Sequence, residues 1–159
     1  MGIDPGSRVT GYGVVETGPQ GARYIASGCI RVVEQVFPLR LKRIFDGVSE
    51  LMALYVADEI AVEQVFMHKN ADSALKLGQA RGAAICAAMQ HGAPVYEYAA
   101  RQVKLALVGK GSADKQQVQH MVKILLSIQG DMPLDASDAL AVALCHCRMQ
   151  ETAMRLRQA

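Results

Sequence analysis

The stretch Glu59-Ile60-Ala61-Val62-Glu63-Gln64-Val65 decides the fold, because it is a short apolar run with charge only near its ends. A run of this kind predicts a central strand that is buried on both faces, as in parallel sheets. Apolar residues recur at helical spacing from 38 to 55 before it, and a long helix is expected after it, from an Asn70 cap to about residue 90. A buried strand between two helices is typical of the crossovers that build a parallel sheet.

The residues before this unit predict antiparallel strands. Residues 11–16 and 23–33 have the pattern of strands, and the turn-forming residues 17–21 between them indicate a hairpin. Gly2-Ile3-Asp4 predicts a first strand that ends at Pro5-Gly6. Three residues are few for a central strand, so we expect a few more apolar residues at the natural N-terminus.

The C-terminal part predicts one more strand and three helices. The strand covers residues 95–98, and helices are expected over 99–107, from a Ser112 cap onward, and from about 135 to 149. The fold class is therefore α/β, with a mixed five-stranded sheet in which an antiparallel meander precedes parallel crossovers, flanked by helices. We expect one domain over residues 1–150 and a polar, frayed tail over 151–159.

The composition excludes several classes of protein. With 159 residues, of which 51% are hydrophobic and 20% charged, the chain is long enough for a core and too apolar for intrinsic disorder. It has no run of 18 apolar residues and no signal-peptide pattern, so we expect a cytoplasmic protein without a membrane segment. The four cysteines lack zinc-site spacing, and we expect free thiols in a reducing compartment.

The charge distribution points to an anionic partner. The net charge is only +2, but residues 64–126 carry 8 Lys and Arg against 3 Asp and Glu, whereas both flanking parts are slightly acidic. A basic middle of this kind favours a local anionic ligand over a uniformly adhesive surface.

Four acidic residues stand at positions where chemistry is plausible: Asp4, Glu63, Asp135 and Asp138. Each also has an ordinary interpretation. Asp4 could begin a β-turn, Glu63 could be an exposed strand end paired with a base, and the two helical acids could cap a helix or complement its dipole. The elements that carry them should nevertheless meet at one end of the sheet. Clustered carboxylates repel unless cations neutralise them, and oxygen ligands suit Mg²⁺ or Mn²⁺, so we expect a two-metal site with ions about 3.5–4 Å apart.

Three further residues are candidates for contacts with a nucleic acid. Phe66 follows Glu63 closely and could stack on an unpaired base, or simply belong to the core. Lys104 and Lys115 flank the Gly109–Gly111 turn and could contact phosphates, or form an ordinary solvated surface. In the long helix, Ala74, Gly78 and Gly82 form a stripe of small residues that could pack on the sheet or on a second subunit.

Several ordered motifs resemble the bacterial RuvC crossover junction endodeoxyribonucleases over residues 1–150. They are Gly2-Ile3-Asp4-Pro5-Gly6-Ser7, Glu63-Gln64-Val65-Phe66, Lys69-Asn70-Ala71-Asp72-Ser73-Ala74, Gly78-Gln79-Ala80-Arg81-Gly82 and Asp135-Ala136-Ser137-Asp138-Ala139-Leu140-Ala141. The resemblance implies a ribonuclease H-like fold and a homodimer that resolves Holliday junctions by paired, symmetric, Mg²⁺-dependent nicks in opposed strands, during recombination and repair. It also implies a partnership with the RuvA–RuvB branch-migration complex.

By motif match, the resemblance assigns Asp4, Glu63, Asp135 and Asp138 to the metal-binding quartet, Phe66 to base stacking, and Lys104 and Lys115 to phosphate contacts. Two ions would activate water and stabilise the departing 3′ oxygen, with Mn²⁺ able to replace Mg²⁺. One domain of 159 residues is too small to enclose a four-way DNA junction, which also favours a dimer.

Other functions remain open from the sequence. A ribonuclease H-like metal nuclease could act instead on RNA or an RNA–DNA hybrid, and a junction-binding module without catalysis is a further alternative. The Asp-x-Gly turn is also similar to the phosphate-binding start of actin-like ATPases, but those need two such domains.

Overall fold

The computed structural model describes residues 1–64 and 70–158. The sheet contains β1 (Gly2–Asp4), β2 (Val9–Gly18), β3 (Gly21–Arg31), β4 (Ile60–Glu63) and β5 (Val95–Tyr98). The helices are α1 (Phe37–Tyr55), α2 (Ala71–Gln90), α3 (Ala100–Val108), α4 (Lys115–Leu125) and α5 (Leu134–Gln158).

The five strands form one mixed sheet in the order β3-β2-β1-β4-β5. The first three strands are antiparallel, whereas β1 pairs in parallel with β4, and β4 in parallel with β5. The buried stretch quoted above is therefore next to the central strand β1, with Ile60, Ala61 and Val62 fully inaccessible to solvent. This arrangement confirms the expected fold class.

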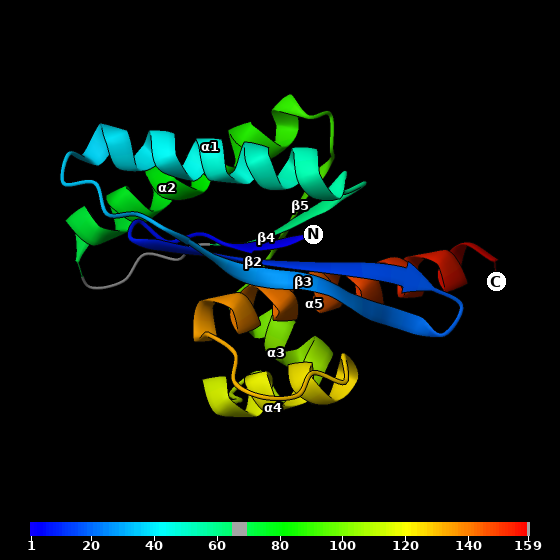
Figure 1. The fold of residues 1–159 in the computed structure, drawn as a ribbon. Coiled ribbons are helices and arrows are strands. Elements are labelled where there is room, and N and C mark those ends of the chain that lie inside the picture. The colour runs from blue at the N-terminus through cyan, green and yellow to red at the C-terminus, as the bar shows by residue number, and fades with distance from the viewer. Residues whose placement is uncertain (65–69, 159) are drawn as a thin grey trace.

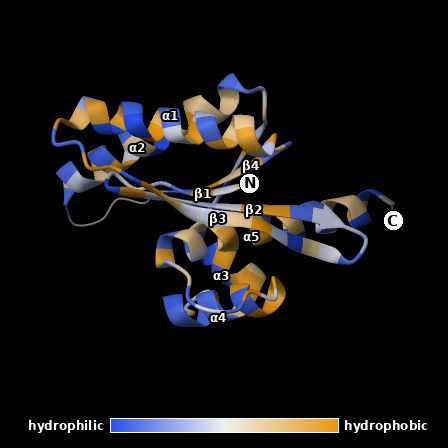
Figure 2. Cartoon of the chain, in the orientation of Figure 1, coloured by the Kyte–Doolittle hydropathy of each residue, from blue (hydrophilic) through white to orange (hydrophobic). Residues whose placement is uncertain are grey.

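Helices cover both faces of the sheet. Figure 1 shows α1 and α2 on one face and α3, α4 and α5 on the other. The core is accordingly in two parts, one under α1 and α2 and one under α3, α4 and α5. Figure 2 shows hydrophobic and hydrophilic segments alternating along α1 and α4, as expected for helices with one buried side. Within the described residues no helix is both long and apolar enough to cross a bilayer.

Two helix ends differ from expectation. Asp114, not Ser112, caps α4: its carboxylate accepts the backbone N–H of Gln117 at 2.8 Å, and the Gln117 side chain accepts the backbone N–H of Asp114. This reciprocal capping box satisfies two free donors at once. At the C-terminus α5 continues to Gln158 instead of ending near Met149, although most side chains after Gln150 are exposed.

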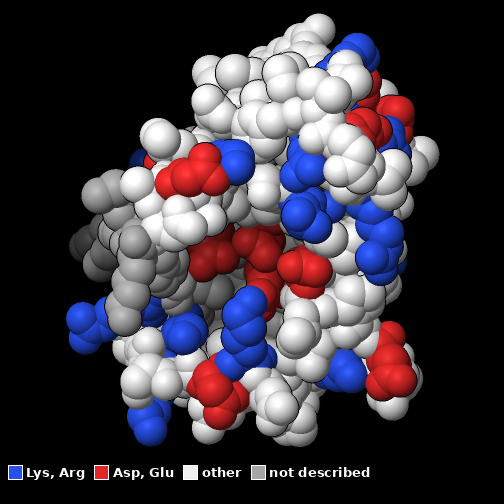
Figure 3. Space-filling model, turned by 90° about the vertical axis from the view of Figure 1, so that its left-hand side faces the viewer, with Lys and Arg blue, Asp and Glu red and all other residues white. Residues whose placement is uncertain are grey.

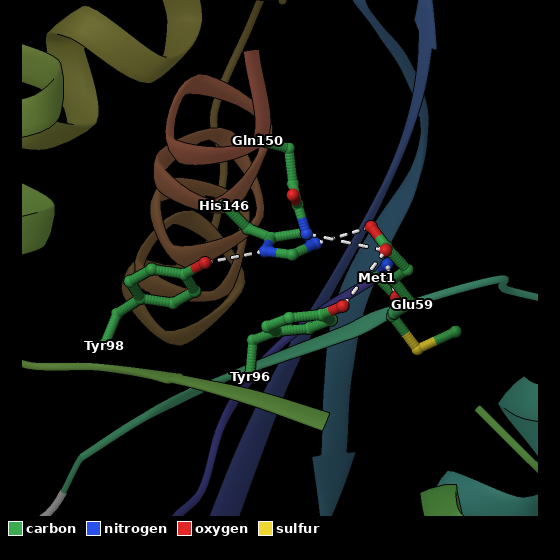
Figure 4. A network of polar contacts seen from close by, with 6 residues as sticks. All are labelled: Met1, Glu59, Tyr96, Tyr98, His146 and Gln150. Atoms are coloured by element: carbon green, nitrogen blue, oxygen red, sulfur yellow. Dashed lines mark hydrogen bonds and ion pairs between the residues drawn. The ribbon is translucent and has the colours of Figure 1, made fainter. Parts of the chain in front are cut away.

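A partly buried polar network connects the middle of α5 to the sheet (Figure 4). His146 contacts the hydroxyl of Tyr98 through Nδ1 at 2.7 Å and the carboxylate of Glu59 through Nε2 at 2.8 Å. Gln150 reaches the same carboxylate at 3.5 Å. The network thereby links α5 to β5 and to the residue before β4.

Candidate active site

Strand pairing brings Asp4 and Glu63 together at the carboxyl ends of two neighbouring strands. Ile3 of β1 pairs with Val62 of β4 in parallel register, so the residues that follow them end neighbouring strands side by side. The carboxyl groups are close enough to form a side-chain hydrogen bond. The sequence expectation that these two strands are adjacent is confirmed.

Glycines bring α5 onto these strands. A Cβ on Gly11 would overlap the backbone carbonyl of Asp135, and one on Gly2 would overlap that of Ala139. A Cβ on Gly13 would come within 2.6 Å of the Leu140 side chain. The bare glycine backbone therefore lets α5 lie directly against β1 and β2.

This close packing places Asp135 and Asp138 in the first turns of α5, beside Asp4. Leu134 is the first residue of the helix, so Asp135 lies inside it and is not the N-cap. None of the predictions from sequence assigned a packing role to Gly2, Gly11 and Gly13. Their signal is the spacing of Gly11 and Gly13, two apart, which puts both on one face of a strand.

The four carboxylates are near enough to one another to affect the ionisation of Asp4. Burial, followed by repulsion from Glu63 and Asp138, raises the pKa of Asp4 to about 8, and Asp135 adds to the rise. Burial and the charge of Asp138 likewise raise the pKa of Glu63. A cluster that cannot hold all its negative charges without compensation is the arrangement in which a cation binds favourably.

Lysine side chains border the acids. The ammonium of Lys115 lies 2.7 Å from Oδ2 of Asp138, and this hydrogen bond raises the pKa of Lys115. Lys104 is near enough to favour the ionised form of Glu63. Both lysines, with Glu63 and Asp138, line a cavity of about 150 Å³ between α3, α4 and α5.

A group of acidic side chains lies in a hollow on one face of the molecule (Figure 3). Figure 3 shows Asp and Glu side chains gathered in the centre of one face, with Lys and Arg side chains around the hollow. Such a surface can hold a cation in its centre and the phosphates of a nucleic acid around it.

The side chains of the cluster have the donor atoms that magnesium prefers. Carboxylate oxygens are the ligands that Mg²⁺ prefers, and burial together with the neighbouring carboxylates raises the pKa values of Asp4 and Glu63. Among residues 1–64 and 70–158, however, no three His, Cys, Asp or Glu side chains stand in a metal-binding arrangement. Asp138 is instead engaged by Lys115.

Two further predictions from sequence concern Phe66 and the stripe of small residues on α2. Phe66 lies outside the described residues, so its stacking role stays a prediction. The small-residue stripe on α2 is not the side that packs on the sheet, because the buried residues of α2 are Ala80, Ala84, Ala87 and Ala88. A Cβ on Gly78 or Gly82 would meet nothing within 4 Å among the described residues.

Comparisons with known proteins agree with this geometry. The family model described as crossover junction endodeoxyribonuclease RuvC matches residues 1–146. A RuvC from Methylococcus capsulatus is 64% identical over 98% of this chain and 94% of its own length. A RuvC from Cronobacter sakazakii is 56% identical over 99% of this chain and 91% of its own length.

Solved structures give the same result. The structure of Thermus thermophilus RuvC in complex with a Holliday junction substrate superposes with a TM-score of 0.88 at 36% identity, covering 96% of this chain and 94% of the other. The yeast mitochondrial Holliday junction resolvase shares the fold, with a TM-score of 0.71, at only 10% identity. The family match and these identities over nearly the whole chain show that this protein belongs to the RuvC family of crossover junction endodeoxyribonucleases, the enzymes that resolve Holliday junctions.

Proposed function

We propose that Asp4, Glu63, Asp135 and Asp138 bind two Mg²⁺ ions per active site, which Mn²⁺ can replace. The observation that carries this proposal is the convergence of carboxylates from β1, β4 and α5 in one hollow, where burial and mutual repulsion raise the pKa of Asp4 to about 8. When bound, such ions lower the pKa of a water molecule and stabilise the negative charge on the leaving oxygen of a phosphodiester.

The chain's own residues would hold and orient the DNA around these ions. Lys104 would contact a phosphate, and so would Lys115 once it leaves Asp138; both line the cavity that Glu63 also lines, which supports this role. Phe66 would stack on a base that is unpaired at the crossover. The substrate would be a four-way DNA junction, as in the Thermus complex.

A homodimer would supply two active sites for the two nicks. The stripe on α2 supports this proposal, because Gly78 and Gly82 leave room that the described part of the chain does not fill, and the nearby Leu75 has 68% of its surface exposed. A stripe of small residues flanked by apolar side chains permits two helices to approach closely. A two-fold dimer matches the approximate two-fold symmetry of a junction and would cut opposed strands symmetrically.

The cellular setting follows from the same activity. We infer that the enzyme acts in the cytoplasm during recombination and repair, together with the RuvA–RuvB branch-migration complex, as its family resemblance implies. Its cysteines are free thiols, in keeping with a reducing compartment.

The test is cleavage of matched substrates with and without Mg²⁺. The protein is incubated with a synthetic four-way junction, a linear duplex of the same sequence and an RNA–DNA hybrid. We expect symmetric cuts in the junction alone, only with Mg²⁺ or Mn²⁺. Junction cleavage that persists in a chelator would refute the metal proposal, and cleavage of the hybrid alone would refute the substrate.

A further inference from the structure

The ammonium group of Lys115 contacts one carboxylate of the acidic cluster, that of Asp138. Nζ of Lys115 lies 2.7 Å from Oδ2 of Asp138, whose side chain is only 16% exposed, whereas 67% of the Lys115 side chain is exposed. The carboxylate is thus held in place by the fold of α5, while the lysine reaches it from solvent on a flexible stem. Of the two partners, the lysine is the one that can leave without unfolding anything.

The backbone around Lys115 does not by itself favour a positive charge there. Lys115 is the first residue of α4, directly after the Asp114 cap. The N-terminus of a helix carries a partial positive charge, which disfavours a cation in the first turn. The favourable partners of this ammonium are therefore the carboxylates opposite it, of which Asp138 contributes most and Asp4 and Glu63 add further attraction.

We propose that Lys115 acts as a counter-ion of the carboxylate cluster. Its ammonium competes with divalent cations for Asp138, and when a cation displaces it, the ammonium binds a DNA phosphate. This inference rests on the proposed metal-binding function of the four acids. The contact that carries it is the ion pair between the Lys115 ammonium and the Asp138 carboxylate.

The competition couples metal binding to DNA binding. A divalent ion that takes Asp138 frees an ammonium at the edge of the cavity that Glu63 and Lys104 also line, where a phosphate can bind it. Conversely, a phosphate that attracts Lys115 uncovers Asp138. Because such coupling is reciprocal, each ligand must strengthen the binding of the other by the same factor. The site would then load metal preferentially when DNA is present.

The experiment measures Mn²⁺ affinity without any cleavage, by electron paramagnetic resonance of free Mn²⁺ in protein without DNA. We compare the native protein with Lys115→Met, which removes the charge, and Lys115→Arg, which retains it. Removing a cation that competes at contact distance should tighten Mn²⁺ binding by about tenfold, and the Arg variant should stay near the native affinity. Lys110→Met is the matched control, because Lys110 is exposed and close in sequence but has no contact with the acids among the described side chains.

A second arm adds an uncleavable junction in which the 3′ bridging oxygens at the crossover are replaced by methylene groups, so that the charge of each phosphate is retained. We expect the junction to tighten Mn²⁺ binding to the native protein several-fold and to tighten it much less in Lys115→Met, where nothing remains to be displaced. Equal Mn²⁺ affinities of the native and Lys115→Met proteins would overturn the inference while leaving the metal proposal intact. A native protein that binds no Mn²⁺ would overturn the metal proposal, and the inference with it.

Discussion

Gly11 of β2 lies against the backbone carbonyl of Asp135 in α5, so closely that no Cβ atom would fit between strand and helix. This contact sets the height of the first turn of α5 above the sheet. Asp135 and Asp138 can therefore reach the acid that ends β1, and the site depends on a residue that itself carries no functional group.

Replacing Gly11 with alanine should damage both stability and activity. The added methyl group would push the first turn of α5 away from the sheet, at a cost of roughly 2–3 kcal/mol in the free energy of unfolding. Urea unfolding measures the loss, and junction cleavage should fall with it. Gly18→Ala in the same strand is the control, since its Cβ meets nothing within 4 Å; a similar loss there would contradict the explanation.

Replacing Glu63 with glutamine should abolish cleavage while junction binding persists. The amide keeps the size of the side chain but removes a charge that would bind metal, so we expect a loss of at least about a hundredfold in single-turnover rate. Gel-shift titration reports binding in the same preparations. Glu16→Gln, at an exposed pair with Arg23, is the control, and near-normal cutting by the Glu63 variant would refute its role as a ligand.

The metal-free protein should lose stability as the pH rises. The folded-state pKa of Asp4 is about 8, against an ordinary value of 3.8, so between these limits the folded state binds more protons than the unfolded state. The stability contributed by Asp4 is thus complete below about pH 4 and is lost progressively up to about pH 8.

Urea midpoints measured in a chelator at pH 5 and pH 8 test this expectation. Asp4→Asn should have a smaller difference between the two midpoints, because its amide does not titrate. Mg²⁺ should restore stability to the native protein at pH 8, since ligand binding to the folded state adds to its stability. An unchanged pH dependence in Asp4→Asn would show that another group is responsible.

Placing a charge on the small-residue stripe should separate the proposed dimer. Gly78→Glu puts a carboxylate on the exposed side of α2, where it would be buried against the second subunit and weaken the association. Light scattering after gel filtration measures the mass. Gln90→Glu at the exposed end of the same helix should remain dimeric. An intact dimer for Gly78→Glu would place the interface elsewhere.

Truncating Phe66 should impair cutting more than binding. Base–aromatic stacking contributes about 1–3 kcal/mol per base. This contribution would stabilise the opened crossover, where a base is unpaired, but not the arms, where the bases remain paired. Single-turnover cleavage by Phe66→Ala should therefore fall by at least about tenfold, while the junction Kd changes less. An unchanged cleavage rate would support the alternative that Phe66 belongs to the core.

The sequence by itself determined the elements and their order. The apolar run of β4, the turn residues of the β2–β3 hairpin and the helical spacing of α1 are local patterns, and each predicted its element to within a few residues. The strands that carry Asp4 and Glu63 were expected to be neighbours, and the pairing of β1 with β4 confirms this, but the convergence of the acids was a hypothesis that the sequence alone did not establish. Motif order was enough to indicate the family.

Only the tertiary structure decided how Asp135 and Asp138 come close to Asp4 and Glu63. The approach of α5 depends on Gly11 and on the His146 network, both contacts between residues far apart in the chain, which no local pattern encodes. The pairing of Lys115 with Asp138 likewise depends on α4 packing beside α5. The shifted start of α4 and the longer α5 have the same cause, since capping partners and packing select among helix ends that local propensity leaves nearly equal in energy.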